Sequence, residues 1–338
     1  MVSLKTIAEK CGVSTATVSK ALNDQKDISE GTKRRIKGVA ESLGYFPNAA
    51  ARALKTNRSY NIGVLFEEEA GSGLTHEYFS GVLNGLKVQA EKKGYDITFI
   101  NTYFENRKMS YYEHCKYRNF EGVAIVCADF NDPGVMELMN GDVPVVTIDY
   151  VHHNCTAVSS NNIQGMEDLV KYIYKHGHRK IAYIHGQENS CVTKDRLASF
   201  FRTLDELGVE IPDEYIRTAD YLETREAAKQ TRELLSLKEP PTCIIYPDDT
   251  SLIGGRNVIM DLGLSIPDDI SIAGYDGTRV SQLLHPKLTT IRQNTELIGS
   301  EAADRLIHTI EKPRTALIER VVIEGILIPG SSVADIAG

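Results

Sequence analysis

The spacing of apolar residues changes about sixty positions from the N-terminus. Before that point apolar residues recur every three or four positions, which is the interval of short amphipathic helices. From Tyr60 onward, short runs of β-branched and aliphatic residues alternate with longer stretches of helical spacing. Such alternation is typical of parallel sheets that helices cover on both faces. The pattern predicts a small all-α head followed by a large α/β body.

Three helices are expected in the head, and a serine stands at the start of each: Ser3, Ser14 and Ser29. Serine is a favoured N-cap because its hydroxyl accepts a hydrogen bond from a backbone N–H at the helix start. Gly12 separates the first two helices, since glycine adopts the left-handed conformation of a tight turn. The expected helices cover residues 4–10, 15–22 and 29–43. This arrangement predicts a helix-turn-helix unit, and the alternative is a plain three-helix core with solvated polar residues.

The second helix of a helix-turn-helix unit enters the major groove of DNA, so its exposed residues face base edges. The methyl groups of Thr15 and Ala16 suit a thymine methyl, and the ammonium of Lys20 can donate to guanine. Polar neighbours would hydrogen-bond phosphates and fix the register without reading sequence. The predicted DNA-contacting residues of the head are Thr6, Ser14, Thr15, Ala16, Thr17, Ser19, Lys20 and Asn23.

Two series of strands and helices are expected in the body. The first has strands at 62–66, 96–100, 122–127 and 145–148 and a helix at 78–93. The second has helices at 163–176, 196–207, 224–235 and 251–262, with strands at 181–185, 215–218, 243–246 and 270–274. Two such series indicate two doubly wound lobes, with a ligand bound at the carboxyl ends of the strands between them.

Charge is distributed unevenly along the 338 residues, whose formal net charge is −8. Residues 1–60 contain eleven lysines and arginines against five acids, so the head carries +6 and the remainder −14. A basic head on an acidic body indicates that only the head meets a polyanion. The head has no continuous basic amphipathic face of the kind that binds anionic lipid, so nucleic acid is favoured as its partner.

Several kinds of chemistry lack their usual motifs. The six cysteines form no Cys-x-x-Cys pair, which favours reduced thiols in the cytoplasm over a disulfide framework or a zinc site. No apolar run is long enough to span a bilayer, and the N-terminus lacks the apolar core of a signal peptide. The adjacent histidines His152 and His153 have no further ligand at metal-binding spacing. Phosphate-binding loops and a nucleophile elbow are also missing, so neither a cofactor nor an enzyme activity is expected.

Motifs along nearly the whole chain resemble the LacI/GalR family of bacterial transcriptional regulators. They lie at residues 4–8, 12–23, 44–54, 175–182, 266–276 and 288–291. The resemblance implies a body like periplasmic binding proteins, in which the chain crosses between the lobes three times. It also implies a cytoplasmic homodimeric repressor that binds a pseudo-palindromic operator under allosteric control by a small effector. A sugar-modifying enzyme or a transport binding protein with a similar body is the alternative, and the head argues against both.

The linker after the head is suited to fold only when something holds it. Pro47 and Asn48 can start a helix, and the residues up to Lys55 are mostly strong helix formers, but so short a helix is unstable alone. The resemblance implies that operator DNA and the partner subunit hold it, with Asn48, Ala51 and Leu54 at the minor groove. Leu54 would wedge between base pairs, and its alternative role is packing against the body.

The resemblance and the chemistry together nominate residues for effector binding. A polyhydroxylated ligand needs charged partners such as Arg196 and Asp276 for its hydroxyls and an aromatic surface to lie on. A salt bridge between Arg196 and Asp276 that closes the cleft is the alternative for that pair, and core packing is the alternative for Phe79. The nominated residues are Glu67, Tyr78, Phe79, Asn161, Ser190, Arg196, Tyr221, Asp248 and Asp276.

Three of these positions depart from the usual family pattern: Glu67, Asn161 and Asp248. Extra carboxylates favour a neutral or aminated ligand rich in hydroxyls over a phosphorylated or purine one, and a sugar is expected. The expected domains are the head at 1–46, the hinge at 47–59 and the body at 60–338. Lobe one spans about 60–160 and 290–322, and lobe two about 161–289 and 323–331. Whether the effector releases DNA or acts as a corepressor stays open.

Overall fold

The computed structural model describes residues 2–46, 53, 57–67, 71–104 and 107–337. Contacts divide the chain into two compact units, residues 1–59 and 60–338. The predicted hinge residues Asn48, Ala51 and Leu54 lie outside the described residues. Within the described ranges, no helix has the length and apolarity needed to cross a membrane.

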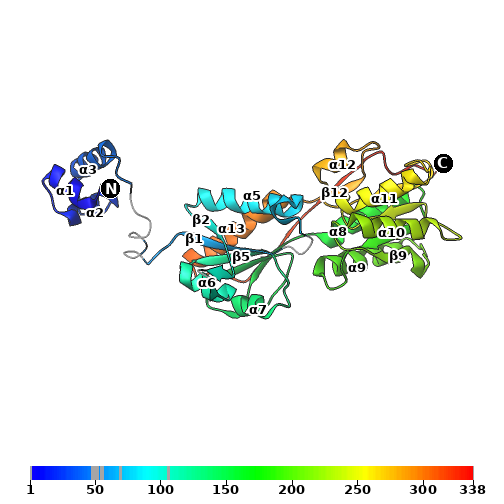
Figure 1. Cartoon of the computed structure of the whole chain (residues 1–338), viewed down its shortest axis with the longest axis horizontal. Helices are drawn as coiled ribbons and strands as arrows, with labels where there is room; N and C mark the ends of the chain where they lie inside the picture. Colours follow the sequence, from blue (N-terminus) through cyan, green and yellow to red (C-terminus); the bar gives the residue numbers. More distant parts are fainter. Residues whose placement is uncertain (1, 47–52, 54–56, 68–70, 105–106, 338) are drawn as a thin grey trace. The chain divides into compact units, whose positions relative to one another are not determined.

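The head consists of the helices α1 (Leu4–Cys11), α2 (Thr15–Leu22) and α3 (Glu30–Ser42) (Figure 1). The three expected serines are their N-caps, and each hydroxyl accepts from the backbone N–H three residues later. Gly12 ends α1 in the left-handed conformation, with φ of 62°. The helices pack around Ile7, Val18 and Ile36, whose side chains are fully buried.

Lobe one of the body is built on a six-stranded parallel sheet in the order β13-β7-β6-β5-β1-β2. The strands are β1 (Asn61–Phe66), β2 (Asp96–Phe99), β5 (Gly122–Cys127), β6 (Val145–Ile148), β7 (Thr156–Ser160) and β13 (Arg320–Ile323). The helices are α5 (Glu77–Lys92), α6 (Tyr111–Arg118), α7 (Pro133–Asn140) and α13 (Thr295–Glu311), with a short 3₁₀ turn η1 (Gly73–Thr75) before α5. A small hairpin, β3 (Tyr103–Phe104) with β4 (Arg107–Lys108), follows β2.

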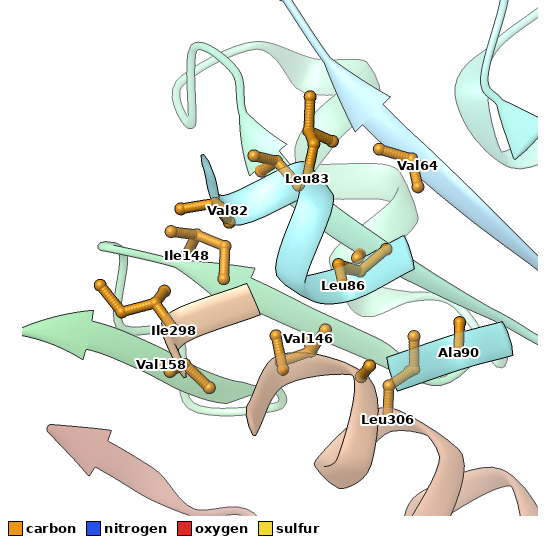
Figure 2. Close-up of a cluster of buried hydrophobic side chains, with 14 of the residues drawn as sticks. Val64, Val82, Leu83, Leu86, Ala90, Val146, Ile148, Val158, Ile298 and Leu306 are labelled. Carbon is orange, nitrogen blue, oxygen red and sulfur yellow. The ribbon is translucent and has the colours of Figure 1, made fainter. Parts of the chain in front are cut away.

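Helices cover both faces of this sheet, as the alternation of strands and helices predicts. Figure 1 shows α5 and α13 along one face and α6 and α7 along the other, in agreement with two separate apolar clusters. In the first cluster Val64 and Val146 of the sheet meet Leu86 of α5 and Leu306 of α13 (Figure 2). The tight layer of α5 and α13 fixes the start of α5, which lies at the candidate effector site.

Lobe two is built on a four-stranded parallel sheet in the order β11-β10-β8-β9. Its strands are β8 (Ile181–His185), β9 (Ile216–Thr218), β10 (Cys243–Ile245) and β11 (Ser271–Ala273). Its helices are α8 (Asn162–Lys175), α9 (Cys191–Glu206), η2 (Asp213–Tyr215), α10 (Thr224–Leu235), α11 (Asp249–Asp261) and α12 (Arg279–Leu283). The apolar cluster on one face uses α8 and α9, and the cluster on the other uses α10 and α11.

The chain passes between the two lobes three times. It leaves the first sheet after β7, returns through β12 (Thr290–Arg292) to α13, and leaves again after β13 through β14 (Ile326–Ile328). The strands β12 and β14 pair with each other in an antiparallel ribbon. These passages put the ends of both sheets close to a shared set of side chains.

Several elements differ from the sequence expectation. Helix α9 begins at Cys191 and not at Arg196, so Arg196 lies in its second turn and not at its start. The polar start of α9, which contains Thr193, Lys194 and Asp195, hid the helical spacing. The strand β7 and the helices α6, α7, α12 and α13 were not among the expected elements. The apolar patterns of β7, α6, α7 and α12 are short, whereas the helical spacing of Ile298, Ala302 and Leu306 in α13 was overlooked.

Candidate functional site

The exposed side of α2 forms a shallow hollow on the head. It has a volume of about 470 Å³ and is lined by Leu4, Thr15, Ala16, Ser19, Lys20 and Gln25. Thr15 and Ala16, which were expected to face base edges, are exposed at the first turn of α2. Lys20 lies one turn further on and forms an ion pair with Asp27. The structure thus brings the three predicted base-reading residues together on one surface.

The predicted phosphate-contacting residues of the head are engaged at helix ends. Ser14 accepts from the backbone of Thr17 at 3.0 Å, and the two hydroxyls lie 2.9 Å apart. Thr6 completes a capping box with Ser3, and the amide of Asn23 donates to the carbonyl of Ser19 at 2.6 Å. These side chains fix the helix ends that present α2, and their contacts with DNA stay predictions.

Arg196 is the centre of the candidate effector site in the body. Only 3% of its side chain is exposed, and its guanidinium lies 3.5 Å from the ring centre of Tyr275. Nε donates to Oδ1 of Asn162 at 2.8 Å, and Nη1 donates to the carbonyl of Pro247 at 2.9 Å. Nη2 lies 3.9 Å from Oδ1 of Asp276, which is too long for a hydrogen bond. Among the residues that the structure describes, Nη2 of this guanidinium therefore has no close hydrogen-bond partner, while the other contacts hold it in place.

Asp276 follows β11 and adopts φ of 95°, a conformation that costs a non-glycine residue free energy. Its Oδ1 accepts from the amide of Gln293 at 2.6 Å. Burial raises the pKa of Asp276 to about 7; Arg196 opposes this rise and the neighbouring Asp248 adds to it. A strained, buried carboxyl with a perturbed pKa is a feature of functional sites.

Lobe one contributes Tyr78 and Asp149. The hydroxyl of Tyr78, at the start of α5, donates to Asp149, which follows β6 with φ of 53°. Asp149 also accepts from the backbone of Ser160 at 3.0 Å. Burial raises the pKa of Asp149, although Tyr78, Ser160 and then Arg196 of lobe two lower it. Sequence reasoning missed Asp149, whose only signal was a carboxylate at the end of an apolar strand.

Aromatic side chains surround the charged pair. The hydroxyl of Tyr221 lies 2.8 Å from that of Thr193 in α9, and its ring stands against Gly186, where a Cβ would collide with it. Within the described part of the chain, the buried hydroxyls of Tyr183 and Tyr275 find no hydrogen-bond partner. Both side chains belong to the apolar cluster that α8 and α9 form with the sheet of lobe two, and the Tyr275 hydroxyl lies against Gly165 of α8. A buried polar group without a partner is costly.

Phe79, the remaining aromatic candidate, packs in an aromatic group of lobe one. Its ring centre lies 5.5 Å from Phe66, 5.1 Å from Tyr78 and 4.6 Å from His76. It is partly buried against the main apolar cluster of the lobe. Phe79 therefore packs in the core in this structure, and its role in stacking against a ligand stays a prediction.

Four other predicted effector residues serve local structure. Asp248 is the N-cap of α11; it is 1% exposed and accepts from the backbone of Leu222 and from Ser251. Asn161 caps α8 and donates to Glu324 at 2.8 Å, and Ser190 stands at the N-cap position of α9. Glu67 is exposed and accepts from the Tyr111 hydroxyl at 2.5 Å.

Another buried carboxyl, Asp249, joins lobe two to the returning chain. It accepts from the backbone and hydroxyl of Thr278 at 2.7 and 3.0 Å, and from the hydroxyl of Thr290 in β12 at 2.7 Å. Burial, followed by the nearby Asp276, raises its pKa to about 8. Sequence reasoning missed it, because its role depends on residues far along the chain. Among the described residues, no cluster of three or more histidines, cysteines or carboxylates is placed to hold a metal.

Two family models match the chain. Residues 3–48 match the bacterial regulatory proteins of the lacI family, and residues 170–333 match the periplasmic binding protein-like domain. Among solved structures, the lac repressor dimer bound to operator and an anti-inducer is 24% identical, with a TM-score of 0.81 and coverage of 98% and 99% of the two chains. The complex of the regulator CelR with cellobiose is also 24% identical, with a TM-score of 0.71 and coverage of 98% and 100%.

Two curated relatives align over almost their full length. The probable repressor ExuR of Bacillus subtilis is 30% identical over 319 residues, which cover 93% of each chain. The repressor PurR of Aliivibrio salmonicida is 29% identical over 315 residues, which cover 92% of this chain and 93% of the relative. Together with the helix-turn-helix head and the two-lobed body, these matches show that the chain belongs to the LacI family of bacterial regulatory proteins and is a DNA-binding transcriptional regulator.

Proposed function

We propose that the protein is a cytoplasmic homodimeric repressor whose two heads bind a pseudo-palindromic operator. The exposed face of α2 and the positive charge of the head support sequence-specific contact with DNA. The curated relatives carry the name transcriptional repressor, and the lac repressor with the same fold was solved as a dimer on its operator. This function requires no catalytic group, and we propose that the chain is not an enzyme.

The effector that we propose is a neutral, hydroxyl-rich molecule of the sugar class. Arg196 offers a guanidinium edge and Asp276 a carboxylate 3.9 Å away, which together can hold two adjacent hydroxyls. The aromatic rings of Tyr275 and Tyr221 lie beside them. Asp149 adds a second carboxyl against the single guanidinium, and this balance disfavours a phosphorylated ligand. The structural relative CelR was solved with cellobiose, a sugar.

The single observation that carries this proposal is that the two lobes supply different parts of one site. Tyr78 and Asp149 belong to lobe one, whereas Arg196 and Asp276 belong to lobe two. A ligand held by both pairs stabilises one relative position of the lobes more than another. It therefore shifts the population of body states, which is the requirement for control of the heads.

The proposal is tested by titrating the full-length protein calorimetrically with a panel of neutral sugars, their phosphates and purine bases. A sugar should bind, and Arg196→Lys should weaken that binding at least about tenfold, because lysine cannot reproduce the flat bidentate edge. Arg202→Lys is the matched control, since Arg202 lies on the same helix but pairs with Glu167 at the surface. Binding of a phosphate or a purine in preference to every sugar would refute the effector class. Equal binding by wild type and Arg196→Lys would remove this arginine from the site.

A further inference from the structure

The loop between α2 and α3 holds two ion pairs, each between a loop carboxylate and a helix lysine. Asp27 pairs with Lys20 of α2, and Asp24 accepts from Lys37 of α3 at 2.6 and 2.8 Å. Both pairs are about half exposed, so neither contributes much to folding. The pairs differ in one respect: Lys20 borders the hollow of the DNA-reading face, whereas Lys37 is not among its lining residues.

The backbone holds the loop against α2 independently of the ion pairs. The N–H of Gln25 donates to the carbonyl of Lys20 at 3.0 Å, and that of Asp24 donates to Ala21 at 3.3 Å. Ile28 packs against the apolar core of the head and anchors the other end of the loop. Asp27, directly before Ile28, is thus held by the loop at a fixed place beside the recognition helix.

A lysine ammonium on its own is a poor reader of bases. It is a compact charge on a flexible four-carbon stem, and it is drawn equally to any phosphate within reach. Its three N–H groups can be used by different acceptors at once. If a fixed carboxylate takes one of them, the remaining two have defined directions, and part of the attraction of the ammonium to phosphates is cancelled.

We infer that Asp27 is a specificity-determining residue that acts through Lys20, by holding its ammonium toward the base edges and away from the phosphate backbone. The inference rests on the proposed docking of α2 in the major groove. Asp27 is a positioning residue in this account, because it is Lys20 that donates to the base. The carboxylate of Asp27 also lies close to DNA in this arrangement, and its negative charge lowers the affinity for all sequences alike.

The experiment begins with selection of preferred duplexes by the full-length protein from a random-sequence double-stranded DNA library. Binding is then measured to the selected duplex, to each of its single-base-pair variants and to a scrambled duplex, at two salt concentrations. The variant is Asp27→Asn, which keeps the shape and removes the charge. Asp24→Asn is the matched control, since it removes the same charge from the same loop but from the pair with Lys37. Thermal melts confirm that both variants fold.

Asp27→Asn should bind the scrambled duplex several-fold more tightly and lose about tenfold of its discrimination at one base pair per half-site. Asp24→Asn should change the affinity for all duplexes equally and leave discrimination intact. In a Lys20→Ala background, Asp27→Asn should no longer alter discrimination. Unchanged discrimination in Asp27→Asn, an equal loss in Asp24→Asn, or a loss that persists without Lys20 would each overturn the inference. A wild-type protein that selects no sequence would overturn the proposed DNA recognition as well.

Discussion

The replacement of Asp276 by asparagine should make the protein more stable while it weakens effector binding. Asparagine keeps the shape of the side chain, and its Oδ1 can still accept from Gln293. What disappears is a buried negative charge that the fold disfavours, because Asp276 has a pKa of about 7 in place of 3.8. The nearby Arg196 does not make the charge of Asp276 favourable for folding, since the pKa of about 7 already includes the attraction of Arg196.

The pH dependence follows from the direction of the shift. A carboxyl whose pKa is raised on folding does not affect stability below its pKa in the unfolded chain, 3.8, because it is protonated in both states. The loss of stability grows as the pH rises from 3.8 to about 7 and is constant above that value. One pKa unit corresponds to 1.36 kcal/mol. The ionisation of Asp276 therefore lowers the free energy of unfolding by about 2 kcal/mol at pH 5 and by about 4 kcal/mol at pH 8. Asp276→Asn should therefore gain stability over wild type mainly between these two pH values.

Urea denaturation of the protein without effector, at pH 5 and at pH 8, measures this difference directly. Asp261→Asn is a suitable control, because Asp261 is exposed at the end of α11. The reasoning fails if Asp276→Asn is less stable than wild type at pH 8, or if its gain is the same at both pH values. Calorimetry with the selected sugar should show that the same variant has lost at least about tenfold in affinity, because a charge-assisted hydrogen bond is replaced by a neutral one.

Two further predictions concern the connection between ligand and DNA. Leu54→Ala should reduce operator affinity and DNA bending without changing the sugar affinity of the body, and gel-shift bending assays together with calorimetry test both parts. Glu77→Gln should speed hydrogen exchange at the amide of Arg279, which donates to Glu77 across the lobes at 2.7 Å. Glu91→Gln, an exposed change on the same helix, should leave that amide unaffected; equal acceleration by both variants would contradict a specific contact between the lobes.

The head was predictable because its signals are local. Each helix start carries a serine whose hydroxyl bonds the backbone three residues later, and a single glycine marks the turn after α1. These interactions need no information from elsewhere in the chain. Lys20 and Asp27 lie seven positions apart, one in α2 and the other in the irregular loop after it, and spacing alone could not predict their ion pair.

The candidate effector site was predictable only in part, because an aspartate that follows a strand can either cap the next helix or face a ligand. Asp248 and Asp276 both follow strands of lobe two, but a helix begins directly after Asp248 and uses both its oxygens. After Asp276 the next helix, α12, begins only at Arg279 with Thr278 as its N-cap, so the carboxylate of Asp276 is not used as a cap and lies at the side of Arg196. Only the exact start of α11 separates the two cases, and the sequence placed that start two residues too late.

Asp149 shows why the rest of the site needed the structure. Its partner Tyr78 lies 71 residues earlier, and the charge that opposes its high pKa comes from Arg196 in the other lobe. Buried carboxyls of this kind destabilise the protein without ligand, so their presence makes sense where hydroxyl donors from a ligand can stabilise the ionised forms. Because those carboxyls come from both lobes, we propose that ligand contacts which relieve their burial would also fix the lobes relative to each other. Under the proposed function, affinity for the effector and control of the body would then be consequences of one arrangement of charges.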